Sequence, residues 1–151
     1  MESKRERLFE LLRTKSFHYR DNPPFTLVSG KTSPCYIDCK PTTNNAEGMC
    51  LIGEIVFERI RDLDPQAIGG LTMGADPIAH AVSVISNQKG RPIHSVCIRK
   101  QAKDHGNVKK HGVEGDASPG DRIVILDDVI TTGGSTIQAI DAAERFGLEV
   151  A

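Results

Sequence analysis

Apolar residues recur with the helical spacing i, i+3, i+4 in four stretches of the chain. These stretches are residues 8–12, 46–60, 78–85 and 135–146. Asp76, followed by Pro77, is the predicted N-cap of the third helix. In the fourth helix, Ile137, Ile140 and Ala143 are predicted to face the core.

Short apolar runs between these helices predict strands. The runs lie at residues 35–40, 67–71, 92–98 and 122–126. The last run is rich in β-branched residues, which is typical of a strand covered on both faces. Helices that alternate with buried strands predict an α/β fold with a largely parallel sheet. Residues 99–119 are polar, contain glycines and show neither the helical nor the strand period of apolar residues. They are therefore predicted to form a long loop.

Length and composition favour one domain over two. The 151 residues carry a net charge of −1, with 26% charged and 38% hydrophobic residues, as in ordinary soluble proteins. The chain has neither a run of about 18 apolar residues nor a secretory signal pattern, so we expect a cytoplasmic protein. Four cysteines without a CxxC pair or a second ligand pair predict reduced thiols, not structural zinc.

The strongest chemical signal follows the fourth predicted strand. Asp127 and Asp128 come directly after the apolar run, at the end of the strand where open α/β sheets bind ligands. A turn rich in hydroxyl groups and glycine then leads into the fourth helix. Glycine lets the backbone approach an anion, and the free N–H groups and dipole of a helix start favour negative charge. The segment therefore predicts a phosphate site, with carboxylates placed to accept hydrogen bonds from ribose hydroxyls.

This segment resembles the binding motif of phosphoribosyltransferases, in which apolar residues, two acids and a Thr/Gly-rich turn follow one another. Blocks at residues 25–34, 36–38, 69–78 and 99–106 resemble the orotate phosphoribosyltransferases, and together they cover almost the whole chain in order. The resemblance implies one phosphoribosyltransferase domain over residues 1–151. Its fold would be of type I, a mostly parallel sheet flanked by helices with a small N-terminal hood. The implied reaction converts orotate and phosphoribosyl pyrophosphate to orotidine 5′-phosphate and pyrophosphate, in pyrimidine (UMP) biosynthesis.

The resemblance also implies roles for individual residues. Lys103, Asp127 and Asp128 are expected to be catalytic. Thr131, Lys31 and Tyr36 are expected to contact orotate. The expected contacts of phosphoribosyl pyrophosphate are Arg99, Lys100, Lys103, His105, Asp127, Asp128, Val129, Ile130, Thr131, Thr132, Gly133, Gly134 and Ser135.

The cationic segment at residues 99–106 suits the departure of pyrophosphate. Arg99, Lys100, Lys103 and His105 place several hydrogen-bond donors on a loop that could close over the leaving group and neutralise it. In the family this loop reaches the active site of the neighbouring subunit, so the resemblance implies a homodimer with shared sites. It also implies Mg²⁺ bound mainly through the substrate, without a firm protein ligand.

The chain departs from the family pattern at three places. Some members carry a lysine where this chain has Val28, and many carry one where it has Gly74. The family's arginine for the orotate carboxylate lies beyond the strand expected to begin at Leu148. The chain is therefore expected to be truncated at its carboxyl end relative to its relatives.

Two other functions stay open on the sequence. A phosphoribosyltransferase for another base, a purine or uracil, would share residues 127–136 but need not share the blocks at 25–34 and 99–106. A non-catalytic regulator would sense phosphoribosyl pyrophosphate and bind RNA or DNA. A net charge of −1 argues against that regulator, so neither nucleic acid nor a membrane is an expected partner.

Overall fold

A five-stranded sheet forms the centre of the protein in a computed structural model, which describes residues 2–27, 30–100 and 112–151. Its order is β7-β6-β5-β8-β9. The strands are β5 (Ala67–Leu71), β6 (His94–Ile98), β7 (Val113–Gly115), β8 (Arg122–Ile125) and β9 (Glu149–Val150). All neighbouring pairs are parallel except β6 and β7. The mostly parallel α/β sheet predicted from the sequence is confirmed.

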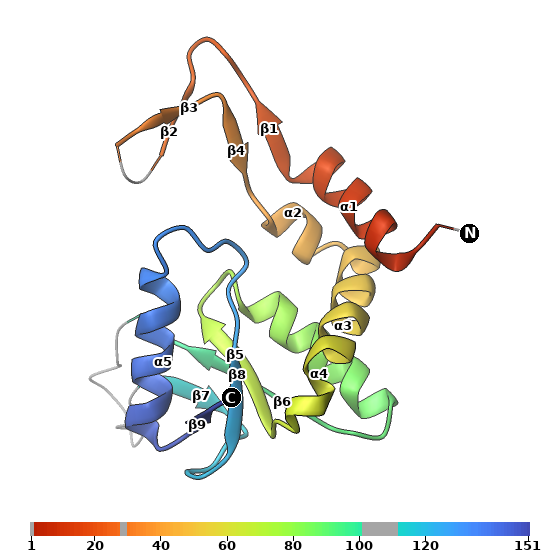
Figure 1. The fold of residues 1–151 in the computed structure, drawn as a ribbon, viewed down its shortest axis with the longest axis vertical. Helices are drawn as coiled ribbons and strands as arrows, with labels where there is room; N and C mark the ends of the chain where they lie inside the picture. Colours follow the sequence, from red (N-terminus) through yellow and green to blue (C-terminus); the bar gives the residue numbers. More distant parts are fainter. Residues whose placement is uncertain (1, 28–29, 101–111) are drawn as a thin grey trace.

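Helices cover both faces of this sheet (Figure 1). The helices of the described residues are α1 (Lys4–Lys15), α2 (Lys40–Thr43), α3 (Ala46–Ile60), α4 (Asp76–Gln88) and α5 (Gly134–Phe146), with a 3₁₀ turn at Arg61–Leu63. α3 and α4 lie on one side of the sheet, and α5 lies on the other (Figure 1). None of the helices in the described residues is long and apolar enough to span a bilayer.

Four short strands before α2 form the N-terminal hood. β1 (Phe17–Tyr19) pairs antiparallel with β4 (Cys35–Ile37), and β2 (Phe25–Thr26) pairs antiparallel with β3 (Thr32–Ser33). The hood projects beyond α2, away from the five-stranded sheet (Figure 1). It is therefore joined to the sheet mainly through α1, α2 and α3.

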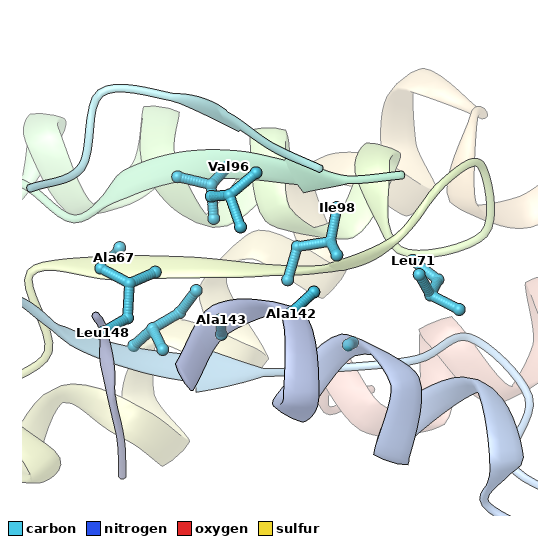
Figure 2. Packing of buried hydrophobic residues seen from close by; sticks show 10 residues of the cluster. Ala67, Leu71, Val96, Ile98, Ala142, Ala143 and Leu148 are labelled. Carbon is cyan, nitrogen blue, oxygen red and sulfur yellow. The ribbon is translucent and has the colours of Figure 1, made fainter. Parts of the chain in front are cut away.

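Two hydrophobic cores stabilise the sheet, one on each face. The first lies between the sheet and α5, where Leu71, Val96 and Ile98 pack against Ala142 and Ala143 (Figure 2). The second lies beneath α3 and α4 and is built around side chains that are almost completely buried. Its members are Phe57, Ile60, Ile68, Ala79, Val82 and Ile93.

Several predicted boundaries were wrong for identifiable reasons. The strand expected at residues 35–40 ends at Ile37, because the Asp38 carboxylate accepts a hydrogen bond from the Lys40 N–H (3.1 Å) and turns the chain into α2. The expected loop 99–119 contains β7, a three-residue edge strand too short to show a period. The N-cap of α4 is Ala75, and Asp76 is the first helical residue.

The inward face of α5 also differs from the prediction. Ile137 is 58% exposed, whereas Ala139, Ala142 and Ala143 are buried. Alanines bring the helix close to the sheet, where a larger side chain would not fit at native packing density. Only Ala143 of the three predicted core residues is buried, and Ile140 is partly buried.

A pair of valines on α4 tests this packing. Val82 is completely buried and Val84 is 59% exposed. Val82→Ala should lower the free energy of unfolding by about 2–3 kcal/mol, because two buried methyl groups are lost and a cavity remains. Val84→Ala should change it by less than about 0.5 kcal/mol. Urea denaturation measures both values, and equal losses in the two variants would contradict the assigned faces of α4.

Candidate active site

The predicted phosphate turn connects β8 to α5 at the carboxyl edge of the parallel strands. Residues 126–133 rise from the sheet toward α2 and the hood (Figure 1). The first of them, Leu126, donates its N–H to the carbonyl of Gly69 (2.8 Å), which continues the pairing of β8 with β5. The turn is thus anchored in the centre of the sheet, between two parallel strands.

The start of α5 has the features of an anion site. Its N-cap is Gly133, whose φ of 79° lies in the left-handed region that glycine tolerates. No side chain caps this helix, so none competes with a ligand for the N–H groups of its first turn. Thr131, Thr132, Gly134 and Ser135 are exposed around it. Hydroxyl groups, exposed backbone and a helix N-terminus therefore meet at one place, as a phosphate requires.

The acidic pair stands at the base of this turn. Both Asp127 and Asp128 are partly buried, and the Asp128 N–H donates to Oδ1 of Asp127 (3.0 Å). Burial raises the pKa of Asp127, and the neighbouring Asp128 carboxylate raises it further. Val129 and Ile130, next along the turn, are 42% and 63% exposed. Apolar side chains thus border the acidic pair on the solvent side.

A second loop, residues 72–75, lies directly against the acidic pair. A Cβ atom at Gly74 would overlap the carboxylate of Asp128. The peptide between Thr72 and Met73 is cis, and the Thr72 N–H donates to the carbonyl of Ile98 (2.8 Å). The loop between β5 and α4 therefore forms one wall of the site, and its close approach depends on the missing side chain at position 74.

The hood side of the site contains residues that the sequence analysis missed. Sγ of Cys39 lies 3.6 Å from the backbone carbonyl of Asp128 and donates to it. The pKa of this thiol is raised, chiefly by burial and then by Asp128. Nothing in the local sequence marks this contact, since its partners are 89 residues apart.

An aromatic stack in the hood holds Tyr36. Its ring stacks on Phe25 with centroids 5.5 Å apart and on His18 at 6.4 Å. The guanidinium of Arg20 lies over the Phe25 ring, 4.4 Å from its centroid. Tyr36 remains partly exposed, and Lys31, near the tip of the β2–β3 hairpin, is also exposed. The stack restrains the Tyr36 ring and leaves part of it accessible.

The cationic residues Arg99 and Lys100 directly follow β6. Nη1 of Arg99 donates to Oε1 of Glu114 on β7 (2.9 Å). Arg99 and Lys100 border a hollow of about 560 Å³. Its other lining residues are Leu71, Gln138, Asp141, Ala142 and Arg145.

The described lining of this hollow includes neither Asp127 nor Asp128. Arg99 and Lys100 follow β6, whereas the acidic pair follows β8, so β5 lies between the two segments in the sheet. Lys103 and His105, the other expected members of this group, lie outside the described residues.

The mostly parallel sheet carries an acidic pair, a hydroxyl- and glycine-rich turn and an uncapped helix start at its carboxyl edge. This arrangement defines a type I phosphoribosyltransferase. No protein-family model matches the chain. The orotate phosphoribosyltransferase of Aquifex aeolicus is 43% identical over 146 residues, which are 97% of this chain and 79% of the relative. The chain therefore belongs to the orotate phosphoribosyltransferase family.

Solved structures agree with this assignment. A crystal structure of Mycobacterium tuberculosis orotate phosphoribosyltransferase with Fe(III) dicitrate superposes with a TM-score of 0.83 at 36% identity, covering 99% of this chain and 81% of the other. Another structure of that enzyme, in complex with 5-phospho-α-D-ribosyl 1-diphosphate, has a TM-score of 0.78 at 34% identity. It covers 99% of this chain and 79% of the other.

The raised pKa of Asp127 predicts a pH-dependent cost to stability. An aspartate whose pKa is higher in the folded chain holds its proton more tightly there, so it favours folding at low pH. That contribution declines as the pH rises from the ordinary value of 3.8 through the raised folded pKa. Asp127→Asn removes the ionisation and should therefore raise Tm at pH 7, with an advantage that shrinks as the pH falls toward 4.

Scanning calorimetry across this pH range measures the effect. Asp62→Asn is the matched control, because the Asp62 side chain is 86% exposed and lies far from the site in the 3₁₀ turn. It should leave Tm unchanged at each pH. A Tm of Asp127→Asn below that of the unmodified chain at pH 7 would contradict the assigned electrostatic cost.

Proposed function

We propose that this chain transfers the phosphoribosyl group of phosphoribosyl pyrophosphate to orotate, forming orotidine 5′-phosphate and pyrophosphate for UMP synthesis. The observation that carries the proposal is the acidic pair set against an uncapped, hydroxyl-rich helix start in a member of the orotate phosphoribosyltransferase family. Family membership favours orotate over a purine or uracil. The net charge of −1 gives no support to a nucleic-acid-binding regulator.

The reaction requires a site that binds a phosphorylated ribose and stabilises positive charge on its ring. Asp127 and Asp128 would accept hydrogen bonds from the ribose hydroxyls, and their negative charge would favour a cation-like transition state. The backbone and hydroxyl groups of residues 131–135 would hold the 5-phosphate at the start of α5. Val129 and Ile130 would exclude water beside the ribose.

Orotate would enter between the hood and the acidic pair. The accessible part of the Tyr36 ring offers a surface for stacking against a planar base. Lys31 and Thr131 would contact the polar edge of the base. The aromatic stack of Tyr36 with Phe25 and His18 supports this assignment because it fixes the ring before the substrate arrives.

The donor set suits Mg²⁺ held partly by substrate. Carboxylate oxygens are hard ligands, and Mg²⁺ is usually bound through one or two carboxylates together with substrate phosphates. Asp127 and Asp128 supply such oxygens, and within the described residues no cluster of three or more His, Cys, Asp or Glu side chains surrounds a metal position. When bound, Mg²⁺ would neutralise charge on the departing pyrophosphate.

The resemblance to the family, in which this cationic loop reaches the neighbouring subunit, supports a shared site in a homodimer. Arg99 and Lys100 border the hollow beside α5, on the other side of β5 from the acidic pair. A loop that starts at Arg99 would meet an acidic pair by extending to a second copy, where Lys103 and His105 would contact pyrophosphate.

We further propose that residues 1–151 act as one domain in the cytoplasm, where the four free thiols stay reduced.

Turnover tests the reaction directly. Orotate consumption, followed by its ultraviolet absorbance, should require both Mg²⁺ and phosphoribosyl pyrophosphate. Lys103→Ala should lower kcat at least about 100-fold, because the charge of the leaving pyrophosphate loses a compensating cation. Lys89→Ala, which removes an exposed lysine 3.8 Å from Glu58, should keep full activity and serves as the control.

Two results would overturn parts of this assignment. If the chain binds phosphoribosyl pyrophosphate but consumes no orotate, the orotate specificity is wrong. If Lys103→Ala and Lys89→Ala are equally active, Lys103 has no part in catalysis.

Subunit mixing tests whether sites are shared. Lys103→Ala and Asp127→Asn should each be inactive alone, since each leaves every site incomplete. After subunit exchange in an equal mixture, half of the dimers are hybrids in which one site carries both substitutions and the other carries neither. About a quarter of all sites are then intact, and activity should return to about that fraction of the unmodified enzyme. A mixture no more active than its separate components would show that each chain builds its own site.

A further inference from the structure

Lys40 lies at the junction between the hood and the acidic pair. It is the first residue of α2, directly after Cys39, whose thiol contacts the backbone of Asp128. Figure 1 shows α2 facing the turn between β8 and α5. The Nζ of Lys40 lies 2.7 Å from Oδ1 of Asp38, and its side chain is 51% exposed.

The surroundings of Lys40 extend to both expected ends of the substrate pocket. Its pKa is raised, first by the hydrogen bond with Asp38 and further by the charge of Asp128. The ammonium group therefore lies in the electric field of Asp128, which belongs to the proposed ribose site. Tyr36 of the proposed base site lies on β4, which leads into α2.

The pocket wall at this place needs a cation. Phosphoribosyl pyrophosphate carries several negative charges, and the wall beside Asp128 is itself acidic. Gly74, pressed against the Asp128 carboxylate, contributes no side chain. Arg99 is paired with Glu114 and borders the hollow beside α5. A positive charge on α2 would offset the repulsion between the acidic pair and the substrate phosphates.

We propose that Lys40 is a substrate-contacting residue that leaves Asp38 and pairs with a phosphate oxygen of phosphoribosyl pyrophosphate. The inference rests on the proposed function for the identity of this ligand. The exchange is feasible because the ion pair is accessible to water, with side chains 51% exposed for Lys40 and 28% for Asp38, and such pairs contribute little. A phosphate oxygen with several formal charges nearby attracts an ammonium group more strongly than one carboxylate does.

Calorimetric binding of phosphoribosyl pyrophosphate to the full chain with Mg²⁺ tests the proposal. Lys40→Gln should raise Kd about tenfold, and Lys40→Arg, which keeps the charge, should stay within about threefold of the unmodified chain. Lys4→Gln is the matched control, because Lys4 forms a comparable ion pair, 2.6 Å from Glu54, between α1 and α3. It should leave Kd unchanged.

Asp38→Asn separates substrate contact from a structural role. This variant breaks the same ion pair but leaves Lys40 available, so it should bind phosphoribosyl pyrophosphate as tightly as the unmodified chain or more tightly. Equal weakening in Asp38→Asn and Lys40→Gln would overturn the proposal, because the ion pair would then matter only for the shape of the hood. An unchanged Kd in Lys40→Gln would overturn it as well.

Orotate binding distinguishes the base end from the phosphate end. The Kd for orotate should be the same in Lys40→Gln and the unmodified chain, and weakening of orotate alone would overturn the proposal. Failure of the proposed function gives a different result. In that case the unmodified chain binds phosphoribosyl pyrophosphate without consuming orotate, and the comparison of Lys40 variants in binding still decides the role of this lysine.

Discussion

The contact between Gly74 and the carboxylate of Asp128 determines the geometry of the whole site. It brings the loop after β5 against the turn after β8, so two segments far apart in sequence form one wall. The two segments also approach closely within the sheet, where a Cβ atom at Gly70 of β5 would overlap the carbonyl of Leu126, directly after β8. Since β5 and β8 are adjacent parallel strands, both contacts depend on the sheet being assembled. The acidic pair is therefore held by backbone, which moves less than side chains do.

The same arrangement creates an electrostatic cost. Burial disfavours the charged form of Asp127, and the neighbouring Asp128 carboxylate repels it as well, so the pKa of Asp127 is raised. A ligand with ribose hydroxyls, a metal ion or a nearby ammonium group relieves this repulsion. The electrostatic free energy of the site is thus less favourable in the chain alone than in the chain with its substrates. Such a cost to stability is common where function requires charge.

Functional groups on this chain are divided between two regions. The acidic pair, the phosphate turn and the hood residues face one another across the carboxyl edge of the sheet. Arg99 and Lys100 lie beside α5, where Glu114 and Asp141 are their acidic neighbours.

Features that depend on short segments could be predicted from the sequence. The fold class, the span of β5 and the start of α3 followed from local periodicity, and the end of α5 followed from Gly147. These succeed because hydrogen bonds, helix caps and turns involve residues close in sequence.

The contacts between distant residues became apparent in the folded structure. The short edge strand β7, the exposed position of Ile137, the pairing of Arg99 with Glu114 and the contact of Cys39 with Asp128 had no local signal. Each depends on the packing of elements that are remote along the chain. Periodicity shows that a helix has an apolar face, but the space left between packed elements decides which side chains fill it.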